Sequence, residues 1–454
     1  MSFKISIPGE LIFFFKKPST SILIKGEPGT GKTILALSLL AMFKKPNSFY
    51  VTTRVNAKTL TLTYPEVMEK IPPSQIIDVY RKNFPTQVDK EVTQFIEYSD
   101  KPTFIKEFSQ KLLKKEDSLV ILDSLEGIQK VLGENIYYEL FEIQQETGSR
   151  LVFVSEYEDS KELDYLVDGL ILLRRVSSEN KFLRELHILK LKGACLKLNT
   201  YFFTLFGGVF RHFEPFQLPA IKERRRFEPL PDTESHFSTG SKDLDEALRG
   251  GYRKGSTVLL ELGKNVSREA YIQMVVPTTL NFLSKGKGVI VIPSLGTSKE
   301  TILSSLSDFI QEEGLNRINV VEKRWGLEKL YKSEQNILED FYYQFEEMSR
   351  KIEPENYFGV FGLDSLLVEF EENISEVLEA ILYMVQKKKL LALFIIKHGT
   401  KELEEVANIV DYHLKIEEKR GVLIFNSLKP KSISYVVEAD YNQGYPQIKL
   451  IPIV

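Results

Sequence analysis

An internal duplication restricts the folds that are open to this chain of 454 residues. The apolar run LVILDSL ends with Asp123, Ser124 and Leu125, and the run VFGLDSL ends with the same three residue types at 364–366. At nearly the same spacing, another apolar run follows each of them, LVFVS in the first half and LALFII in the second. Landmarks that recur in one order indicate a duplicated unit, so we expect both halves to adopt the same type of fold.

The apolar runs are short and hydrophobic on both faces, which is typical of strands in a parallel sheet with helices on both sides. Segments with helical periodicity lie between them, such as ILALSLLAMF from Ile34 and ISEVLEAILYMVQ from Ile374. Each half ends in strands joined by short turns, including LRELHILKL at 183–191 and GVLIFNSL at 421–428. The sequence therefore predicts an α/β fold of two tandem domains, each a mostly parallel sheet covered by helices, with antiparallel strands at its C-terminal edge.

A proline-rich segment, PFQLPAIKERRRFEPLPDTESHF, separates the halves. Its repeated prolines disfavour both a helix and a central strand, so we predict a linker at 215–237. The flanking domains are then residues 1–214, with a nucleotide site, and residues 238–454, without a working one. The basic run from Lys222 to Arg226 fits either a solvated surface or a docking segment for a partner.

Composition excludes several classes of protein. The chain has 60 Lys+Arg against 63 Asp+Glu and a net charge of -3, so it lacks the overall basic field of a nonspecific nucleic-acid coat. Its single cysteine excludes an internal disulfide, and its five histidines are too scattered for a zinc motif. The apolar stretch LIFFF near the start is too short to span a membrane and has no signal cleavage site. We expect a cytoplasmic protein without a membrane partner.

The first half contains a phosphate-binding motif. Residues 26–33 read GEPGTGKT, directly after the strand SILIK and directly before a helix. The pattern GxxxxGK[ST] in this context is a P-loop, whose glycines let several backbone N–H groups point at phosphates. A glycine-rich turn that merely begins a helix is the alternative. The predicted cofactor-binding residues are Gly26, Glu27, Pro28, Gly29, Thr30, Gly31, Lys32 and Thr33.

Three side chains are expected to carry the chemistry of this site. Lys32 can reach the terminal phosphates of ATP, and the Thr33 hydroxyl can ligate Mg²⁺. Asp123, at the end of an apolar strand, is suited to hold the water shell of the metal, although a structural strand-end acid would look the same. We therefore predict ATP and Mg²⁺ as cofactors, with Lys32 and Asp123 as catalytic residues and Thr33 and Asp123 at the metal.

Several segments together resemble one superfamily. The P-loop, the Asp123 strand, ELDYLVDGLILLRR and RELHILKLKG are similar to the RecA superfamily, particularly its KaiC-like and RadA-like archaeal members. STGSKDLDEALRGGYRKGS, from Ser238, resembles the stretch that precedes the P-loop in KaiC domains. In its short N-terminus, YVTTR and arginine clusters, the layout is closest to the gas-vesicle regulator GvpD and its homologues. This resemblance implies two RecA-like domains and an archaeal regulator that acts on a protein partner through arginine-rich segments.

The second half departs from the P-loop pattern. Aligning Gly263 with Gly26 places GKNVSREA over GEPGTGKT. Arg268 then replaces the glycine at the turn, Glu269 replaces the lysine and Ala270 replaces the threonine. Because a carboxylate facing a triphosphate reverses the electrostatics of the site, we predict that this half does not bind ATP in the usual way.

The first half lacks one acid that the resemblance leads us to expect. KaiC-like and RecA-like enzymes carry a catalytic glutamate at the end of the strand after the P-loop helix, but here YVTTR ends in Arg54. Glu126 and Glu156 are candidate substitutes, and each also fits an ordinary surface acid. Arg54 fits either a phosphate contact or a surface salt bridge. We expect weak ATP hydrolysis at one site, with the nucleotide acting as a switch.

Other charged segments bear on the partners. The loop EYEDSKELD corresponds to the DNA-contacting loop of recombinases, and its acids would repel phosphate, which argues against a nucleic-acid partner without excluding one. Lys190 and Lys192 match a pair that reaches the nucleotide of a neighbouring subunit in KaiC-like rings, so a homo-oligomer stays open, as does a plain exposed strand face. Arg174 and Arg175 fit either a docking site or a solvated face.

The sequence thus predicts an ATP-binding regulatory protein of the KaiC-like and GvpD-like type, a slow nucleotide-dependent switch that acts on a protein partner. One alternative is an active KaiC-like ATPase or autokinase, which steady-state phosphate release would reveal. The other is a RadA-related DNA-repair accessory protein, which a salt-dependent DNA-binding titration would support.

Overall fold

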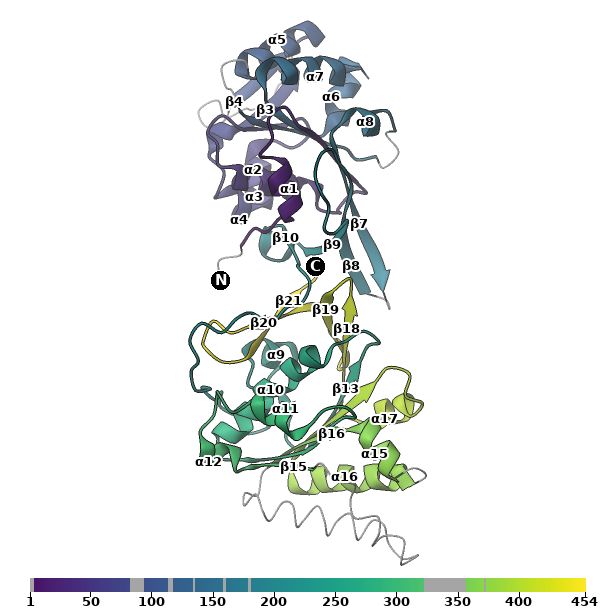
Figure 1. The fold of residues 1–454 in the computed structure, drawn as a ribbon. Helices are drawn as coiled ribbons and strands as arrows, with labels where there is room; N and C mark the ends of the chain where they lie inside the picture. The colour runs from purple at the N-terminus through teal and green to yellow at the C-terminus, as the bar shows by residue number, and fades with distance from the viewer. Residues whose placement is uncertain are drawn as a thin grey trace, which may run out of the picture. The chain divides into compact units, whose positions relative to one another are not determined.

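The computed structural model describes residues 4–81, 94–112, 117–133, 135–157, 161–178, 181–321, 357–370 and 373–454. The chain divides into two compact units, Met1–Phe213 with Ile453–Val454, and Glu214–Pro452 (Figure 1). The helices described in the first unit are α1 (Gly9–Phe14), α2 (Lys32–Phe43), α3 (Ala57–Thr63), α4 (Pro65–Met68), α5 (Lys101–Leu112), α6 (Leu125–Leu132), α7 (Ile136–Thr147) and α8 (Lys161–Leu166).

The first unit is built on a ten-stranded sheet. Its strands are β1 (Ser21–Gly26), β2 (Phe49–Thr52), β3 (Ile76–Arg81), β4 (Gln94–Tyr98), β5 (Leu119–Asp123), β6 (Arg150–Val154), β7 (Gly169–Ser178), β8 (Lys181–Leu191), β9 (Thr200–Thr204) and β10 (Arg211–His212). The order across the sheet is β10-β9-β8-β7-β1-β6-β5-β2-β3-β4. From β7 to β4 neighbouring strands are parallel, and β8, β9 and β10 continue the sheet in antiparallel pairs.

The central strand β1 shows why the sheet is covered on both faces. Ile22 and Ile24 belong to one apolar cluster, together with residues of α1 to α4. Leu23 points to the other face and belongs to a cluster with residues of α5 to α8. Since side chains alternate along a strand, a strand that is apolar at every position must be buried on both sides.

The second unit repeats this plan with a nine-stranded sheet and a two-stranded ribbon of β11 (His236–Phe237) and β12 (Tyr252–Arg253). The strands of the large sheet are β13 (Ser256–Leu262), β14 (Gly288–Ile292), β15 (Ile318–Val320), β16 (Tyr357–Gly362), β17 (Leu391–Lys397), β18 (Tyr412–Lys419), β19 (Val422–Lys429), β20 (Ser434–Asp440) and β21 (Gln447–Pro452). Its described helices are α9 (Lys242–Ala247), α10 (Arg268–Ser284), α11 (Lys299–Ser304), α12 (Glu312–Leu315), α15 (Leu363–Phe370), α16 (Ile374–Lys388) and α17 (Leu403–Ile409).

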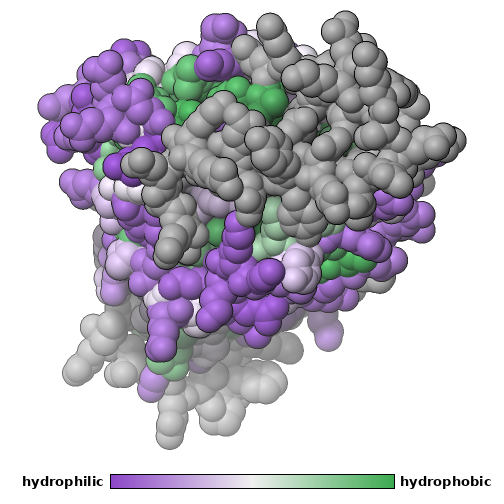
Figure 2. Space-filling view, turned by 90° about the horizontal axis from the view of Figure 1, so that it is seen from below, coloured by the Kyte–Doolittle hydropathy of each residue, from purple (hydrophilic) through white to green (hydrophobic). Residues whose placement is uncertain are grey.

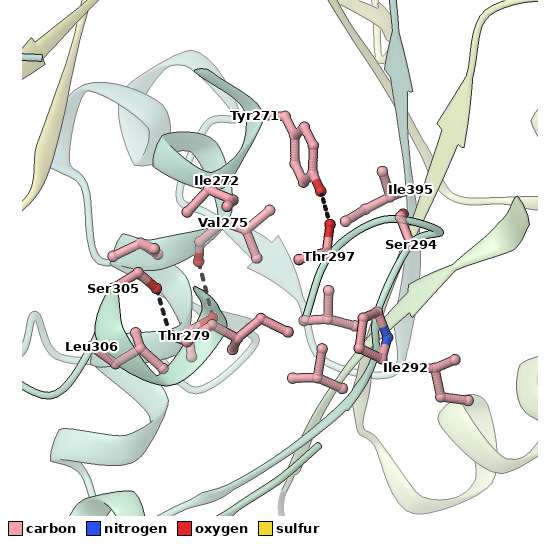
Figure 3. A pocket seen from close by; sticks show the side chains of 15 residues that line it. Tyr271, Ile272, Val275, Thr279, Ile292, Ser294, Thr297, Ser305, Leu306 and Ile395 are labelled. Atoms are coloured by element: carbon pink, nitrogen blue, oxygen red, sulfur yellow. Dashed lines mark hydrogen bonds between the residues drawn. The ribbon is translucent and has the colours of Figure 1, made fainter. Parts of the chain in front are cut away.

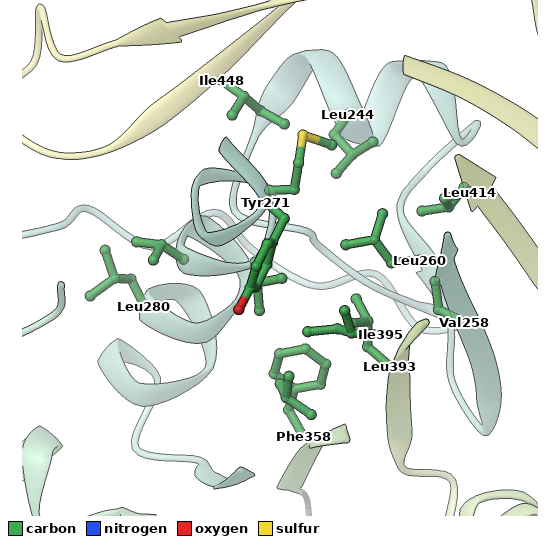
Figure 4. Packing of buried hydrophobic residues seen from close by; sticks show 14 of the residues in the cluster. Leu244, Val258, Leu260, Tyr271, Leu280, Phe358, Leu393, Ile395, Leu414 and Ile448 are labelled. Carbon is green, nitrogen blue, oxygen red and sulfur yellow. The ribbon is translucent and has the colours of Figure 1, made fainter. Parts of the chain in front are cut away.

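Apart from β4, which has no counterpart among the described strands of the second sheet, the two sheets have the same topology. The second runs β15-β14-β16-β17-β13-β18-β19-β20-β21, which matches β3-β2-β5-β6-β1-β7-β8-β9-β10 of the first, strand for strand. The core of the second unit is formed in the same way, and Leu244 of α9, Leu280 of α10 and Leu260 of β13 belong to one apolar cluster (Figure 4). The predicted fold of two RecA-like domains with antiparallel C-terminal edges is therefore confirmed, and the duplication is visible as one strand order used twice.

The segment 215–237 differs from a free linker, because its backbone bonds to the second unit. The Phe216 N–H donates to the carbonyl oxygen of Gly421 at 2.7 Å, and the Phe227 N–H donates to that of Phe309 at 2.8 Å. The Phe227 ring is 5% exposed and lies 5.0 Å from the Tyr445 ring, centroid to centroid. The prolines keep the segment out of regular helices, but they do not prevent its other residues from packing on the second unit.

The face in Figure 2 carries mostly hydrophilic side chains among its described residues, and hydrophobic ones show in smaller patches. Within the described residues, each helix is too short or too polar to cross a lipid bilayer.

Candidate nucleotide-binding site

The loop between β1 and α2 depends on its glycines. Gly26, Gly29 and Gly31 have φ of 149°, 77° and 106°, a region that side chains rarely allow. A Cβ atom on Gly26 would lie 2.4 Å from the Leu173 carbonyl oxygen. Gly31 is the N-cap of α2, and no side chain caps the helix there, so the first N–H groups of α2 are left for an anion. The loop therefore fits a polyphosphate.

The Lys32 ammonium folds back on this loop. Its Nζ atom donates to the carbonyl oxygens of Gly26 at 2.6 Å and Glu27 at 3.0 Å, and the side chain is buried. Burial lowers the pKa of Lys32, while the carboxylates of Glu156, Asp123 and Glu126 oppose that shift. A buried cation held only by neutral carbonyls has much to gain from a phosphate oxygen.

The side chains of Thr33 and Asp123 contact each other. The Thr33 hydroxyl donates to Asp123 Oδ2 at 2.7 Å, and the Tyr50 hydroxyl donates to the same oxygen. Burial raises the pKa of Asp123, and these two hydrogen bonds oppose the rise. A hydroxyl and a carboxylate are hard oxygen ligands, so this pair could hold Mg²⁺ together with phosphate oxygens and water. The described residues contain no group of three or more His, Cys, Asp or Glu that could hold a metal by itself.

Tyr50 escaped the sequence analysis because an aromatic residue in an apolar run looks like a core residue. It lies on β2, which is the neighbour of β5 in the sheet, and its side chain is buried. Burial and the nearby Asp123 raise the pKa of the Tyr50 hydroxyl well above its usual value. The hydroxyl therefore remains a donor that holds Asp123 in place.

The two candidate acids are in different situations. Glu156 forms an ion pair with Arg54, and both side chains are exposed, so Arg54 makes the surface salt bridge that was one of its two alternatives. Glu126 accepts at Oε1 from the Ser155 hydroxyl and from the Glu156 N–H at 2.9 Å. Its other oxygen, Oε2, is buried without a hydrogen-bond partner among the described residues. Of the two, Glu126 is better placed to receive a hydrogen bond from a water molecule.

Two arginines flank the phosphate loop. Nη1 of Arg184 donates to the carbonyl oxygens of Gly29 at 3.1 Å and Thr30 at 3.2 Å. Arg175 lies opposite Arg184 in the β7–β8 ladder, and its Nη2 atom is 3.8 Å from the place of a Cβ on Gly29. In the sequence, Arg175 stands out only as part of a basic run and Arg184 belongs to no motif, because only the strand pairing brings the two residues to the loop.

Other charged residues of the first unit are engaged within the chain. Lys190 Nζ donates to the carbonyl oxygens of Asp164 at 2.9 Å and Tyr165 at 3.2 Å, and Lys192 Nζ donates to Asp168 Oδ1 at 3.1 Å. In the acidic loop, Asp164 also forms an ion pair with Lys25, whereas Glu158 and Asp159 lie outside the described residues. These contacts explain the lysine pair without a neighbouring subunit.

In the second unit the corresponding helix begins differently. The first α-helical bond of α2 runs from the Leu35 N–H to Gly31 O, and that of α10 runs from the Tyr271 N–H to Ser267 O. Ser267 therefore takes the place of Gly31, and Arg268 takes the place of the P-loop lysine. The alignment from sequence, which put Glu269 in the lysine position, was wrong by one residue because it matched Gly263 to Gly26, whereas the strand pairing places Leu262 in the position of Gly26.

This second loop is unsuited to phosphate for a different reason than the predicted charge reversal. The Ser267 hydroxyl accepts from the Ala270 N–H at 3.2 Å, so a side chain occupies the helix terminus. Residues 263–267 are all described, and none has a positive φ, so the loop lacks the turned N–H groups of the first. The strand register places Gly362 in the position of Asp123, and Asp364, two residues later, is paired with Lys397 at 2.7 Å between Oδ2 and Nζ.

A small cavity lies beside α10. It has a volume of about 60 Å³ and is lined mainly by apolar side chains, among them Val275, Ile292 and Ile395 (Figure 3). At one side of it the hydroxyls of Tyr271 and Thr297 are 2.8 Å apart and bonded to each other. A cavity of this size and polarity cannot receive a triphosphate.

The fold and the first site define a class. A glycine loop with an uncapped helix terminus, next to an acid at the end of a parallel strand, is the site of a P-loop protein of RecA-like fold. Residues 11–189 match the family model described as GvpD gas vesicle protein, P-loop domain, and residues 226–318 match the model described as GvpD basic region 2. The chain is thus similar to GvpD over its P-loop domain and over a stretch of the second unit.

Two relatives from Halobacterium salinarum support this similarity. The chain is 31% identical to Protein GvpD1 over 324 residues, which cover 66% of this chain and 60% of the relative. It is 29% identical to Protein GvpD2 over 310 residues, which cover 65% of this chain and 62% of the relative. The chain thus matches about three fifths of the length of these curated relatives.

Proposed function

We propose that this protein binds one ATP with Mg²⁺ in its first unit and that the bound nucleotide switches its action on a protein partner in an archaeal cytoplasm. One observation carries the proposal above all. The helix after the loop is uncapped and its lysine faces the loop in the first unit, whereas Ser267 caps the corresponding helix in the second. A single chain therefore offers one site for a triphosphate.

Phosphate binding, metal binding and orientation of the acid are assigned to different residues of the proposed site. The backbone N–H groups of the loop and the Lys32 ammonium would bind the phosphates, with Lys32 exchanging two neutral carbonyls for charged oxygens. Thr33 and Asp123 would hold Mg²⁺, which when bound neutralises phosphate charge. Tyr50 keeps Asp123 oriented toward Thr33 by its hydrogen bond.

Hydrolysis in this proposal is slow. The strand β2 ends in Thr52 and is followed by Thr53, whose hydroxyl donates to the Ser124 carbonyl oxygen at 3.0 Å, so no acid stands there. Glu126 is the acid we propose to orient the attacking water, since its Oε2 atom is buried and has no hydrogen-bond partner in the described parts of the chain. A single acid outside the usual position supports a nucleotide switch better than a rapid enzyme.

The proposed protein partner is supported by exposed arginines on the second unit. Arg224 is paired with Asp308 at 3.2 Å and Arg225 with Glu223 at 2.8 Å, yet their side chains remain 63% and 64% exposed. Guanidinium groups held in this way can exchange these carboxylates for those of an acidic protein surface.

Calorimetric titration with Mg-ATP tests the nucleotide site. We expect one ATP per chain, with binding weakened at least about tenfold in Lys32→Ala because a charge-assisted contact is lost. The matched control is Arg268→Ala, which removes the residue in the corresponding place of the second unit, and Glu269→Ala is a second control. Both should bind ATP like the native chain. Two ATP per chain, or full binding by Lys32→Ala, would contradict the proposal.

A further inference from the structure

The outer side of the phosphate loop is held by a cation that the proposed chemistry does not use. Nη1 of Arg184 donates to two successive carbonyl oxygens, those of Gly29 and Thr30. Its Nε atom donates to the Val454 carbonyl oxygen, so the guanidinium is engaged on two sides. Three acceptors on one partly buried guanidinium indicate a fixed side chain rather than a freely moving surface arginine.

These contacts set the direction of the N–H groups in the loop. A trans peptide is planar, so its N–H points away from its own carbonyl. Because the carbonyls of Gly29 and Thr30 point to Arg184, the N–H groups of Thr30 and Gly31 point to the opposite side of the loop. That side includes the N-terminus of α2, where Gly31 is the uncapped N-cap. Arg184 thus holds the Gly31 N–H toward the place of an anion.

Arg175 adds a second positive charge at the same place. Directly opposed residues of an antiparallel pair project from the same face of the sheet, and Arg175 is opposed to Arg184. Burial, together with the charge of Arg175, lowers the pKa of Arg184. The Arg175 side chain forms no hydrogen bond or ion pair with the residues that the structure describes. Two like charges this close are an arrangement that a nearby anion stabilises.

We propose that Arg184 is a positioning residue for the phosphate loop and that Arg175 assists it electrostatically, so that this arginine pair raises the affinity for phosphate groups without contacting the nucleoside. The inference rests on the nucleotide site proposed above. It assigns part of the basic run Arg174–Arg175 to the site itself, where the sequence had suggested docking or solvation. It also accounts for the choice of arginine at 184, whose planar fork reaches several acceptors at once.

The experiment uses the full chain and two probes, Mg-ATP and inorganic tripolyphosphate with Mg²⁺, titrated by calorimetry. Arg184→Gln should weaken both probes about tenfold, and Arg175→Gln about threefold, since the first loses charge-assisted bonds and the second loses charge alone. Arg184→Lys, which keeps the charge but not the planar fork, should recover only part of the loss. Arg174→Gln is the matched control, because alternation along β7 places its side chain on the opposite face, and it should bind both probes normally.

The outcomes separate this inference from the proposed function. If the native chain binds neither probe, the nucleotide site itself is wrong. If the native chain binds both and the variants Arg184→Gln and Arg175→Gln bind them equally well, only the arginine pair is wrong. A loss for ATP without a loss for tripolyphosphate would also overturn the inference, since the arginines would then read the nucleoside. Arg175 is exposed, so its variant keeps the test valid if Arg184→Gln fails to fold.

Discussion

Asp123 offers the most direct test of the proposed site. Its ionised carboxylate would favour Mg²⁺ binding, whereas burial in the ligand-free fold disfavours the ionised form. Burial raises its pKa above the usual 3.8, so the native state holds a proton on Asp123 more tightly than the unfolded chain does. Stability from this group is therefore lost as the pH rises from about 4 through the folded pKa. In Asp123→Asn this loss should disappear.

The hydrogen bonds around Asp123 allow the size of the effect to be worked out. The amide oxygen of Asp123→Asn still has two lone pairs for the hydroxyls of Tyr50 and Thr33, so we expect no loss of stability at pH 7. Asp123→Ala removes both acceptors. Tyr50 is 1% exposed, and leaving its hydroxyl unpaired costs about 1–3 kcal/mol. Thr33 is partly exposed and can turn to water.

Scanning calorimetry of the full chain between pH 4 and pH 7 is the assay, in the absence of nucleotide. The transition of the first unit is the one that Mg-ATP raises in the native protein. The reasoning fails if Asp123→Asn is destabilised as much as Asp123→Ala at pH 7. It also fails if the stability of Asp123→Asn decreases as the pH rises, as in the native chain. Whatever its effect on stability, Asp123→Asn is expected to lose the magnesium dependence of ATP binding.

Two further results are expected. Glu126→Gln should slow ATP turnover at least tenfold with unchanged ATP affinity, whereas Glu156→Gln should slow turnover less. Turnover is measured by phosphate release, and equal effects of the two variants would contradict the proposed role of Glu126. Phe227→Ala should destabilise the second unit by about 3–5 kcal/mol, and its control Arg224→Ala by less than about 1 kcal/mol, as measured by calorimetry; similar losses would mean that the arginine is a structural tie.

The sequence by itself determined the features that depend on near neighbours along the chain. The loop GEPGTGKT, its flanking strand and helix, and the apolar runs buried on both faces all follow from short patterns. The pairing of Thr33 with Asp123 could also be expected, since both belong to one motif set whose geometry recurs. The duplication predicted one architecture for both halves, and the two sheets share their strand order.

The tertiary structure decided the contacts between segments that no local pattern connects. Tyr50 meets Asp123 because β2 lies beside β5, and Arg184 reaches the phosphate loop because β7 is paired with both β1 and β8. The correct match between the two loops became visible only from the strand register and from the residue at which α10 begins. Side-chain periodicity reveals which face of a strand is buried, but not which strand lies next to it or in which register. Those two quantities decide which distant residues share a site.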